Sequence, residues 1–205
     1  MNMPVLQGKF IKLEPLGLDH ADSLAEASAG NEALYKWTPV PQGKAAAINY
    51  IQTAIAMRDT GTAVPFAIIG QEDGLFKGST RFWNMEYWPW PEGHPRSANK
   101  VADACEIGHT WLAQSATRTG INTEVKLLLL THAFETWKVL RVCLHTDVRN
   151  ERSRAAIERI GGKLEGILRA HKMSADFMPR NSARYSILIE EWPVVKENLT
   201  ALLNR

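Results

Sequence analysis

The feature that most constrains this chain is a short polar turn between two strongly apolar runs. Thr117–Glu124 (TRTGINTE) follows a strand-like run, Ile107–Leu112, and precedes a helix-like run, Val125–Trp137. The first backbone N–H groups of a helix have no partner within the helix, and the helix dipole adds positive potential there. A strand, a glycine-containing turn and a helix start therefore form an anion-binding unit, and this turn is typical of a phosphate site.

Two interpretations of the turn remain open from these residues alone. Gly120 lets the backbone approach a ligand closely, and Arg118 offers a planar charged fork. Thr119 and Thr123 add hydroxyl groups. The simpler interpretation is a strand-to-helix connection in which Asn122 caps the helix. The turn has neither the lysine of a P-loop nor the glycine spacing of a dinucleotide fingerprint, so it does not identify the ligand by itself.

The rest of the chain alternates between strand-like and helix-like segments. Turn residues at 71–74 and proline-containing loops at 31–43 and 86–102 separate them. Strands are predicted over 10–14, 63–70, 75–83, 104–113, 140–146, 166–172 and 183–189, and helices over 19–29, 44–58, 123–137, 150–160 and 193–203. This order predicts a mixed α/β fold, with a mostly antiparallel sheet flanked by helices. Without a linker or repeat, residues 1–205 are expected to form a single domain.

Charge and cysteine content argue against several classes of protein. The formal net charge of +2 over 205 residues gives no broad electrostatic surface for nucleic acid or membrane. Cys105 and Cys143 lie in apolar runs and are expected to be free buried thiols, and no His/Cys spacing indicates a metal site. Neither a signal peptide nor a membrane-spanning segment is predicted, so the expected compartment is the cytoplasm.

A second polar segment narrows the choice of ligand. Thr146–Gly162 (TDVRNERSRAAIERIGG) places Asn150 and Ser153 one helical turn apart at a helix start. It resembles the strand–helix unit with which GNAT N-acetyltransferases contact acetyl-CoA, which reads Asn-x-x-Ser, then an apolar helix that ends at glycine. Glu106-Ile107-Gly108 looks like the central strand of that family. The resemblance runs from about residue 6 to residue 192, and it is closest to the ribosomal-protein N-terminal acetyltransferases, the RimJ/RimL-like branch.

The resemblance implies a GNAT-like acyl-CoA N-acyltransferase fold, acetyl-CoA as co-substrate and no metal. It places the CoA pyrophosphate on the turn, the pantetheine arm along one strand edge and at the next helix start, and Arg154 near the phosphates. The implied contact residues are Trp111, Leu112, Ala113, Arg118, Thr119, Gly120, Ile121, Asn122, Thr123, Asn150, Ser153 and Arg154. The family loop is usually Arg/Gln-x-x-Gly-x-Gly/Ala. This chain has Thr117 and Asn122 at the outer positions, so its side-chain contacts to the pyrophosphate differ from the family's.

Acyl transfer to an amine needs a neutral amine and a stabilised leaving thiolate. Glu106 is the candidate base, because a carboxylate is costly to bury in an apolar strand without a purpose. The alternative is a strand-edge carboxylate that pairs with an arginine or faces solvent. Strand alternation places His109 on the opposite face, as a packed histidine. Ser153 is the candidate donor to the sulfur; the alternative roles of Asn150 and Ser153 are those of a helix cap and its first-turn companion.

Several aromatic residues are candidates for binding the acceptor substrate. Trp37, Trp83 and Tyr87 are the candidate substrate-binding residues, and the alternative is a loop folded onto its own small core. The predicted activity is acetyl transfer to a primary amine by direct attack, with a protein or peptide N-terminus as acceptor. Two rivals remain open: a small amine such as an antibiotic, polyamine or amino acid, and a non-catalytic acyl-CoA-binding or sensing module. Pairing of the aromatic loop or the final strands in a homodimer also stays open.

Overall fold

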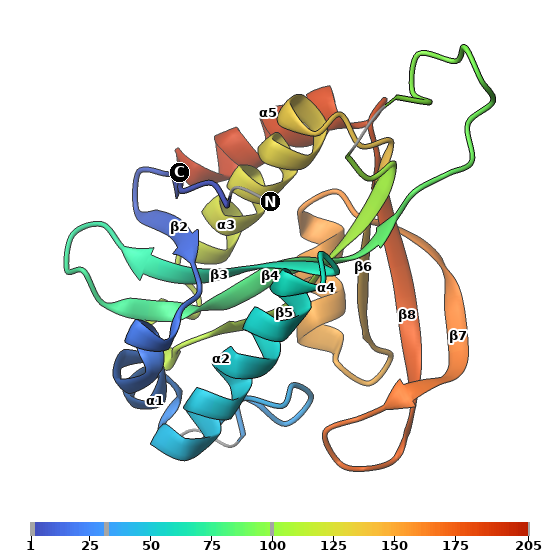
Figure 1. Ribbon diagram of the computed structural model, residues 1–205. Coiled ribbons are helices and arrows are strands. Elements are labelled where there is room, and N and C mark those ends of the chain that lie inside the picture. Colours follow the sequence, from blue (N-terminus) through green and yellow to red (C-terminus); the bar gives the residue numbers. More distant parts are fainter. Residues whose placement is uncertain (1–2, 31–32, 99–100, 205) are drawn as a thin grey trace.

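The computed structural model describes residues 3–30, 33–98 and 101–204, so positions 31, 32, 99 and 100 of the two predicted loops lie outside the described residues. Figure 1 shows a central sheet with helices on both faces. The strands are β1 (Leu6–Gln7), β2 (Ile11–Pro15), β3 (Ala63–Gly70), β4 (Phe76–Glu86), β5 (Ala104–Leu112), β6 (Arg141–Asp147), β7 (Lys163–Met173) and β8 (Pro179–Leu188). The helices are α1 (Ala21–Ser28), α2 (Lys44–Asp59), α3 (Ile121–Thr131), α4 (Glu151–Arg159) and α5 (Trp192–Leu203).

The eight strands form one sheet in the order β1-β2-β3-β4-β5-β6-β8-β7. Every neighbouring pair is antiparallel except β5 and β6. The parallel pairing joins only Ala104–Glu106 to Arg141–Cys143, although β5 runs on to Leu112 and β6 to Asp147. The two central strands therefore diverge after Glu106, and the prediction of a mixed, mostly antiparallel sheet is confirmed.

Each face of the sheet covers its own apolar core. Helices α3 and α5 lie on one side, and α1 and α2 lie on the other (Figure 1). The first core contains Ile107 of β5, Leu129 of α3 and Ile157 of α4. The second contains Ile51 of α2 and Trp111 of β5. Strict alternation would place Ile107 and Trp111 on the same face, but the β4–β5 register shifts by one residue between them. Trp111 therefore turns to the other face, and β5 supplies both cores.

Most predicted elements are present, and the differences lie at their ends. The predicted strand 63–70 coincides with β3. The predicted helix 123–137 begins two residues earlier, at Ile121, and its last part is a π-helical turn, His132–Thr136. The final hairpin is longer than predicted, since its exposed edge strand β7 has no continuous apolar pattern to mark its start.

Cys105 and Cys143 are free and buried, which confirms the prediction for both thiols. Among the helices of the described residues, none has the length and the apolar character that crossing a membrane requires.

Candidate functional site

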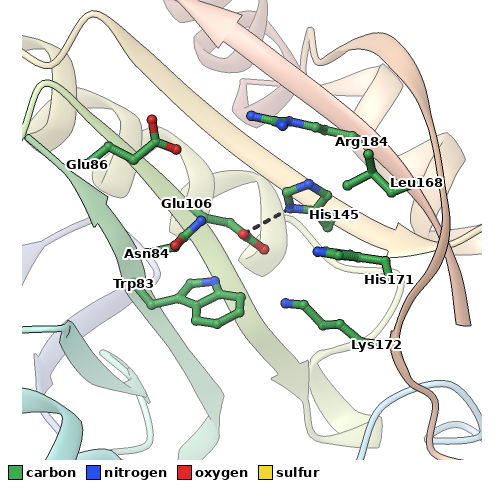
Figure 2. Close-up of a pocket in the computed structure, with 9 residues that line it drawn as sticks. All are labelled: Trp83, Asn84, Glu86, Glu106, His145, Leu168, His171, Lys172 and Arg184. Carbon is green, nitrogen blue, oxygen red and sulfur yellow. Dashed lines mark ion pairs between the residues drawn. The ribbon is translucent and has the colours of Figure 1, made fainter. Parts of the chain in front are cut away.

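The candidate site lies where β5 and β6 diverge. Glu106 is the last β5 residue paired with β6, and its carboxylate lines a pocket of about 280 Å³. Glu106 Oε2 lies 2.9 Å from His145 Nδ1, and the two side chains are 5% and 6% exposed. Figure 2 shows this pair at the centre of the pocket. The predicted alternative of a solvent-facing carboxylate is therefore excluded, because Glu106 has a histidine partner and faces the pocket.

His145 is not among the residues predicted from the sequence, although the strand pattern carries a signal for it. Cys143 is the cross-strand neighbour of Glu106, so both side chains lie on one face of the sheet. His145 is two residues further along β6 and returns to that face. Both ring nitrogens of His145 are buried and form no hydrogen bond of good geometry among the described residues, so the approach of Nδ1 to Glu106 is a close contact between the two groups. A correct β5–β6 register would have brought His145 into the site.

The opposite wall of the pocket comes from β7 and β8. His171 lies 5.3 Å from His145 between ring centroids, and its Nδ1 is 3.1 Å from the hydroxyl of Ser182. Lys172 Nζ lies 4.0 Å from the centre of the Trp83 ring, over its face. Burial lowers the pKa of the Lys172 ammonium. Figure 2 shows His171 and Lys172 projecting from β7 towards Glu106 and Trp83, so acidic and basic groups share one pocket.

The predicted placement of His109 is wrong. Strand β5 contains a bulge, because Arg81 pairs with Gly108 while Ser79 pairs with Trp111, which leaves two β5 residues opposite one of β4. His109 has a φ of +51° and packs edge-on against Trp83, 4.9 Å between centroids. Since Trp83 is the cross-strand neighbour of Glu106, the bulge brings His109 to the Glu106 side of the strand. His109 therefore contacts Trp83, but it is exposed and does not lie on the opposite face.

A second pocket of about 390 Å³ adjoins the first, since Trp83 and Asn84 line both. Tyr87 lines this second pocket, together with Thr60, Thr62 and the methionines Met57 and Met85. Two of the predicted substrate-binding residues, Trp83 and Tyr87, are thus brought to neighbouring pockets.

Trp37, the third predicted substrate-binding residue, lies elsewhere. Its ring packs under the guanidinium of Arg149, 4.3 Å from the ring centre, and it lines neither pocket. The structure therefore does not bring Trp37 together with Trp83 and Tyr87.

The aromatic loop after β4 is tied to the protein by Asp103. The carboxylate of Asp103 accepts hydrogen bonds from the Trp88 backbone N–H at 2.8 Å and from Trp90 Nε1 at 2.8 Å. Arg96 Nη1 lies 3.3 Å from the same carboxylate, and the Trp90 and His94 rings stack at 4.3 Å. This part of the loop folds onto itself, which was the simpler interpretation.

The predicted phosphate turn has a different backbone from the one expected. The left-handed residue is Arg118, with a φ of +60°, whereas Gly120 has ordinary helical angles of −68° and −11°. A Cβ added at Gly120 would meet its nearest atom, on Leu203, at an ordinary 3.5 Å. Gly120 is therefore not needed for a left-handed conformation, because the turn changes direction two residues earlier, and the close approach of a ligand to its backbone stays a prediction.

The start of α3 also corrects the alternative interpretation of the turn, in which Asn122 caps the helix. Gly120 is the N-cap, and Asn122 is the second helical residue, so Asn122 does not cap the helix. The Thr119 hydroxyl accepts from the Ile121 N–H at 3.2 Å and donates to the Ala116 carbonyl at 2.7 Å. Thr123 is buried. Thus Thr119 has local partners for its hydroxyl, and the anion-binding capacity of the turn rests on the helix start and on the exposed Arg118.

One edge of β5 is available for a ligand. Beyond Glu106, no described strand pairs with the side of β5 that faces β6. Trp111 itself is buried in the second core, and Ala113 donates its backbone N–H to Lys77 on the other side at 2.8 Å. The main chain beyond Glu106 therefore presents peptide groups without a strand partner to the opening between β5 and β6. The Leu112 carbonyl already accepts from the Tyr35 hydroxyl at 3.1 Å, and an extended amide-containing ligand could pair with the other groups.

The start of α4 lies directly after the end of β6. Asn150 Oδ1 accepts from the Ser153 backbone N–H at 3.0 Å, so Asn150 is a helix N-cap and is nearly buried. Arg154 donates through Nε to the Tyr185 hydroxyl at 3.1 Å. No contact joins Ser153 to Glu106; the two predicted catalytic residues lie on α4 and β5. The cap role of Asn150 is observed, and its ligand role stays a prediction.

Replacement of Asn150 by Ala is expected to lower the free energy of unfolding by about 1 kcal/mol, because the first turn of α4 loses its cap acceptor. Urea denaturation followed by circular dichroism measures this. Asn150→Asp is the control, since it keeps an acceptor oxygen at the same position. Equal stability of Asn150→Ala and the wild type would contradict the cap assignment.

A lysine is buried behind the β5 bulge. Lys126 of α3 is 6% exposed and donates to the Thr110 hydroxyl at 2.9 Å, and Thr110 lies 2.8 Å from the hydroxyl of Thr80. No described carboxylate lies within ion-pair distance of the Lys126 ammonium. Burial therefore lowers the pKa of Lys126 to about 7.

This burial predicts a specific pH dependence of stability. Between pH 7 and the ordinary lysine pKa of about 10.4, the unfolded chain binds a proton that the folded chain has released. The free energy of unfolding should then rise with pH by up to about 1.4 kcal/mol per pH unit. Urea denaturation at pH 7, 8 and 9 should show this rise in the wild type and not in Lys126→Met. The same pH dependence in both proteins would contradict the assignment.

Comparison with known proteins gives three results. The model of the acetyltransferase (GNAT) domain family matches residues 11–163. The chain is 37% identical over 94 residues to "Putative ribosomal N-acetyltransferase YdaF" of Bacillus subtilis; the match covers 46% of this chain and 50% of YdaF, so the chain spans about half the length of that relative. Among solved structures, it is similar to a GCN5-related N-acetyltransferase from Brucella melitensis, with a TM-score of 0.84 and 25% identity over 99% of this chain and 86% of that one.

A further solved structure is similar in fold. It is Mycobacterium smegmatis RimJ in complex with CoA-disulfide, with a TM-score of 0.76 and 23% identity over 94% of this chain and 88% of that one.

Proposed function

The chain belongs to the GNAT acetyltransferase domain family, and from this premise we propose that it transfers the acetyl group of acetyl-CoA to the N-terminal amine of a protein or peptide. The proposed enzyme is a single domain that works in the cytoplasm. A homodimer stays a prediction from the aromatic loop and the final strands.

The divergence of β5 and β6 supports acetyl-CoA as the co-substrate. The unpaired edge that leads to Trp111, Leu112 and Ala113 offers backbone partners for the amide groups of pantetheine. Proposed contacts to the rest of the molecule come from the α3 start (Arg118, Thr119, Gly120, Ile121, Asn122 and Thr123) and from α4 (Asn150, Ser153 and Arg154). When bound, acetyl-CoA supplies the thioester carbonyl and the thiolate leaving group.

The catalytic assignment rests on the Glu106–His145 pair. Glu106 is proposed to take a proton from the acceptor ammonium, directly or through a water, so that the neutral amine can attack the thioester carbonyl. His145, 2.9 Å from this carboxylate, orients it. As the new C–N bond forms and the C–S bond breaks, the attacking nitrogen releases its second proton and the departing thiolate takes up a proton to leave as the thiol. Ser153 is proposed to donate a hydrogen bond to the departing sulfur.

The observation that favours an extended acceptor is the second pocket. It adjoins the Glu106 pocket at Trp83 and Asn84, and it is lined by threonine, methionine and tyrosine side chains without a charged group. A peptide whose amine reaches Glu106 can extend its following residues into this second pocket. A small amine acceptor would need only the first pocket.

Release of free thiol from acetyl-CoA tests the proposal, with peptides that begin with Ser or Ala compared with polyamines, aminoglycosides and amino acids. Thiol release with the peptides supports an N-terminal acetyltransferase. Thiol release with the small amines alone would show that the acceptor is a small molecule and not a peptide. Thermal stabilisation by acetyl-CoA without release for any acceptor supports a CoA-binding module and overturns the proposed catalysis.

A further inference from the structure

A lysine of the Glu106 pocket and a neighbouring arginine have no carboxylate within ion-pair distance among the described residues. Lys172 lines the pocket, and Arg180 is its cross-strand neighbour on β8. No carboxylate of the described residues lies within 4.0 Å of either side chain. By contrast, Arg184 on the same wall lies 3.4 Å from Glu165, and Arg149 lies 2.8 Å from Asp147. Lys172 and Arg180 thus differ from neighbouring basic residues, whose charge is already compensated.

Both side chains are held in place by uncharged groups. Lys172 lies over the face of Trp83 at 4.0 Å. Arg180 Nε donates to the Ser182 hydroxyl at 2.8 Å, and His171 Nδ1 lies 3.1 Å from the same hydroxyl. Both residues are half-buried, and burial lowers the pKa of Lys172 and of Arg180. Glu106 acts on both cations, and Asp147 acts on Arg180, only from beyond ion-pair distance. Partly desolvated cations that no carboxylate contacts bind an anion more strongly than solvated ones do.

The two acids of the pocket, Glu106 and Glu86, do not supply the carboxylate contact that Lys172 and Arg180 lack. Glu106 has His145 as its partner at 2.9 Å, and the proposed reaction needs Glu106 for the proton of the amine. Glu86, the other acid of the pocket, forms no ion pair among the described residues, so it does not compensate Lys172 at short range. An acceptor that brought only its ammonium group would meet the charge of Lys172 on its way to Glu106.

We propose that Lys172 and Arg180 bind a carboxylate close to the acceptor's primary amine, so that the preferred acceptor is a peptide with Asp or Glu among its first two residues. This inference rests on the proposed function and specifies its acceptor. The carboxylate compensates the two cations on the β7–β8 wall, and the amine then lies on the Glu106 side of the same pocket. The side chain of an acidic residue and the α-carboxylate of a free amino acid share this chemistry, and the adjoining second pocket favours the peptide.

Peptides of equal length that begin Ser-Glu, Ser-Gln and Ser-Lys provide the test. The wild type is expected to acetylate the Ser-Glu peptide with a kcat/KM about tenfold above that of the Ser-Gln peptide, with the Ser-Lys peptide lowest. Lys172→Gln should remove most of this preference, and Lys172→Glu should reverse it. Arg169→Gln is the matched control, because Arg169 is an exposed cation on β7 that does not line the pocket. Serine and serine amide form a second arm for the free amino acid.

The outcomes separate this inference from the proposed function. Acetylation of all three peptides at equal rates overturns the carboxylate site and leaves the N-terminal acetyltransferase standing. An equal loss of preference in Lys172→Gln and Arg169→Gln assigns the effect to overall charge and also overturns the site. Acetylation of serine, but not of serine amide or of any peptide, would support a carboxylate site at Lys172 and Arg180. It would overturn the proposal that the acceptor is a peptide. Failure with every acceptor overturns the proposed function, and this inference with it.

Discussion

Replacement of Glu106 by Gln is expected to lower kcat for acetyl transfer at pH 7 by about 10²- to 10⁴-fold, the usual contribution of a general base. The substitution keeps the shape of a side chain that is 5% exposed and packed against His145, so the fold should persist. Thiol release at saturating acetyl-CoA and acceptor measures the rate. The thermal shift that acetyl-CoA produces should be unchanged, because Glu106 is not a proposed contact of the cofactor.

A double-mutant cycle sharpens this prediction. If Glu106 and His145 act as a unit, Glu106→Gln combined with His145→Gln should cost little more than Glu106→Gln alone. A purely structural role of His145 would instead lower the stability of His145→Gln without any coupling in kcat. Full activity of a folded Glu106→Gln would reject Glu106 as the base.

Replacement of Glu124 by Ala is expected to lower the free energy of unfolding by about 3 kcal/mol, since a buried carboxylate loses several charge-assisted hydrogen bonds. Glu124 Oε1 accepts from the Lys9 N–H at 2.6 Å, and Oε2 accepts from the N–H groups of Phe10 and Ile11 at 2.8 and 2.9 Å. These bonds join the turn between β1 and β2 to the first turn of α3, the helix of the proposed pyrophosphate site. Urea denaturation measures the loss.

Two variants serve as controls for Glu124. Glu124→Gln keeps one acceptor oxygen but turns an N–H donor towards the other backbone N–H groups, so it should also be less stable than the wild type, by less than Glu124→Ala. Glu26→Ala removes an exposed carboxylate on α1 and should change stability by at most about 0.5 kcal/mol. A similar small change in Glu124→Ala would show that the three bonds contribute nothing net.

The elements of the fold could be predicted from sequence because their signals are local. The apolar run at 63–70 is fully buried in β3 and needed no knowledge of its neighbours. Asn150 and Ser153 could likewise be placed at a helix start from their spacing alone. The bulge in β5 could not be predicted, because it depends on which β4 residues pair with β5, and it overturned the strict alternation that placed His109.

The candidate site likewise combines residues that a local signal predicts with contacts that depend on the tertiary fold. Glu106 was identified from its own chemistry, as an acid in an apolar strand. The bonds of Glu124 to the chain near Phe10 join residues 114 positions apart, and no local pattern marks them. Trp37, Trp83 and Tyr87 were grouped by residue type, and the fold separated Trp37 from the other two.

The sequence by itself determined the family, through the resemblance of its Asn150–Gly162 segment, and the acid at position 106. It also determined most of the strands and helices and the polar helix start at Asn150, because periodicity and capping act within one or two turns of chain. Only the tertiary structure decided that β5 and β6 part after Glu106 and that His145 becomes the partner of this acid. It also decided that Lys172 of the pocket and its cross-strand neighbour Arg180 have no carboxylate within ion-pair distance among the described residues. These relations depend on the register between strands and on the burial of side chains by distant segments of the chain. Both exist only once the sheet has formed.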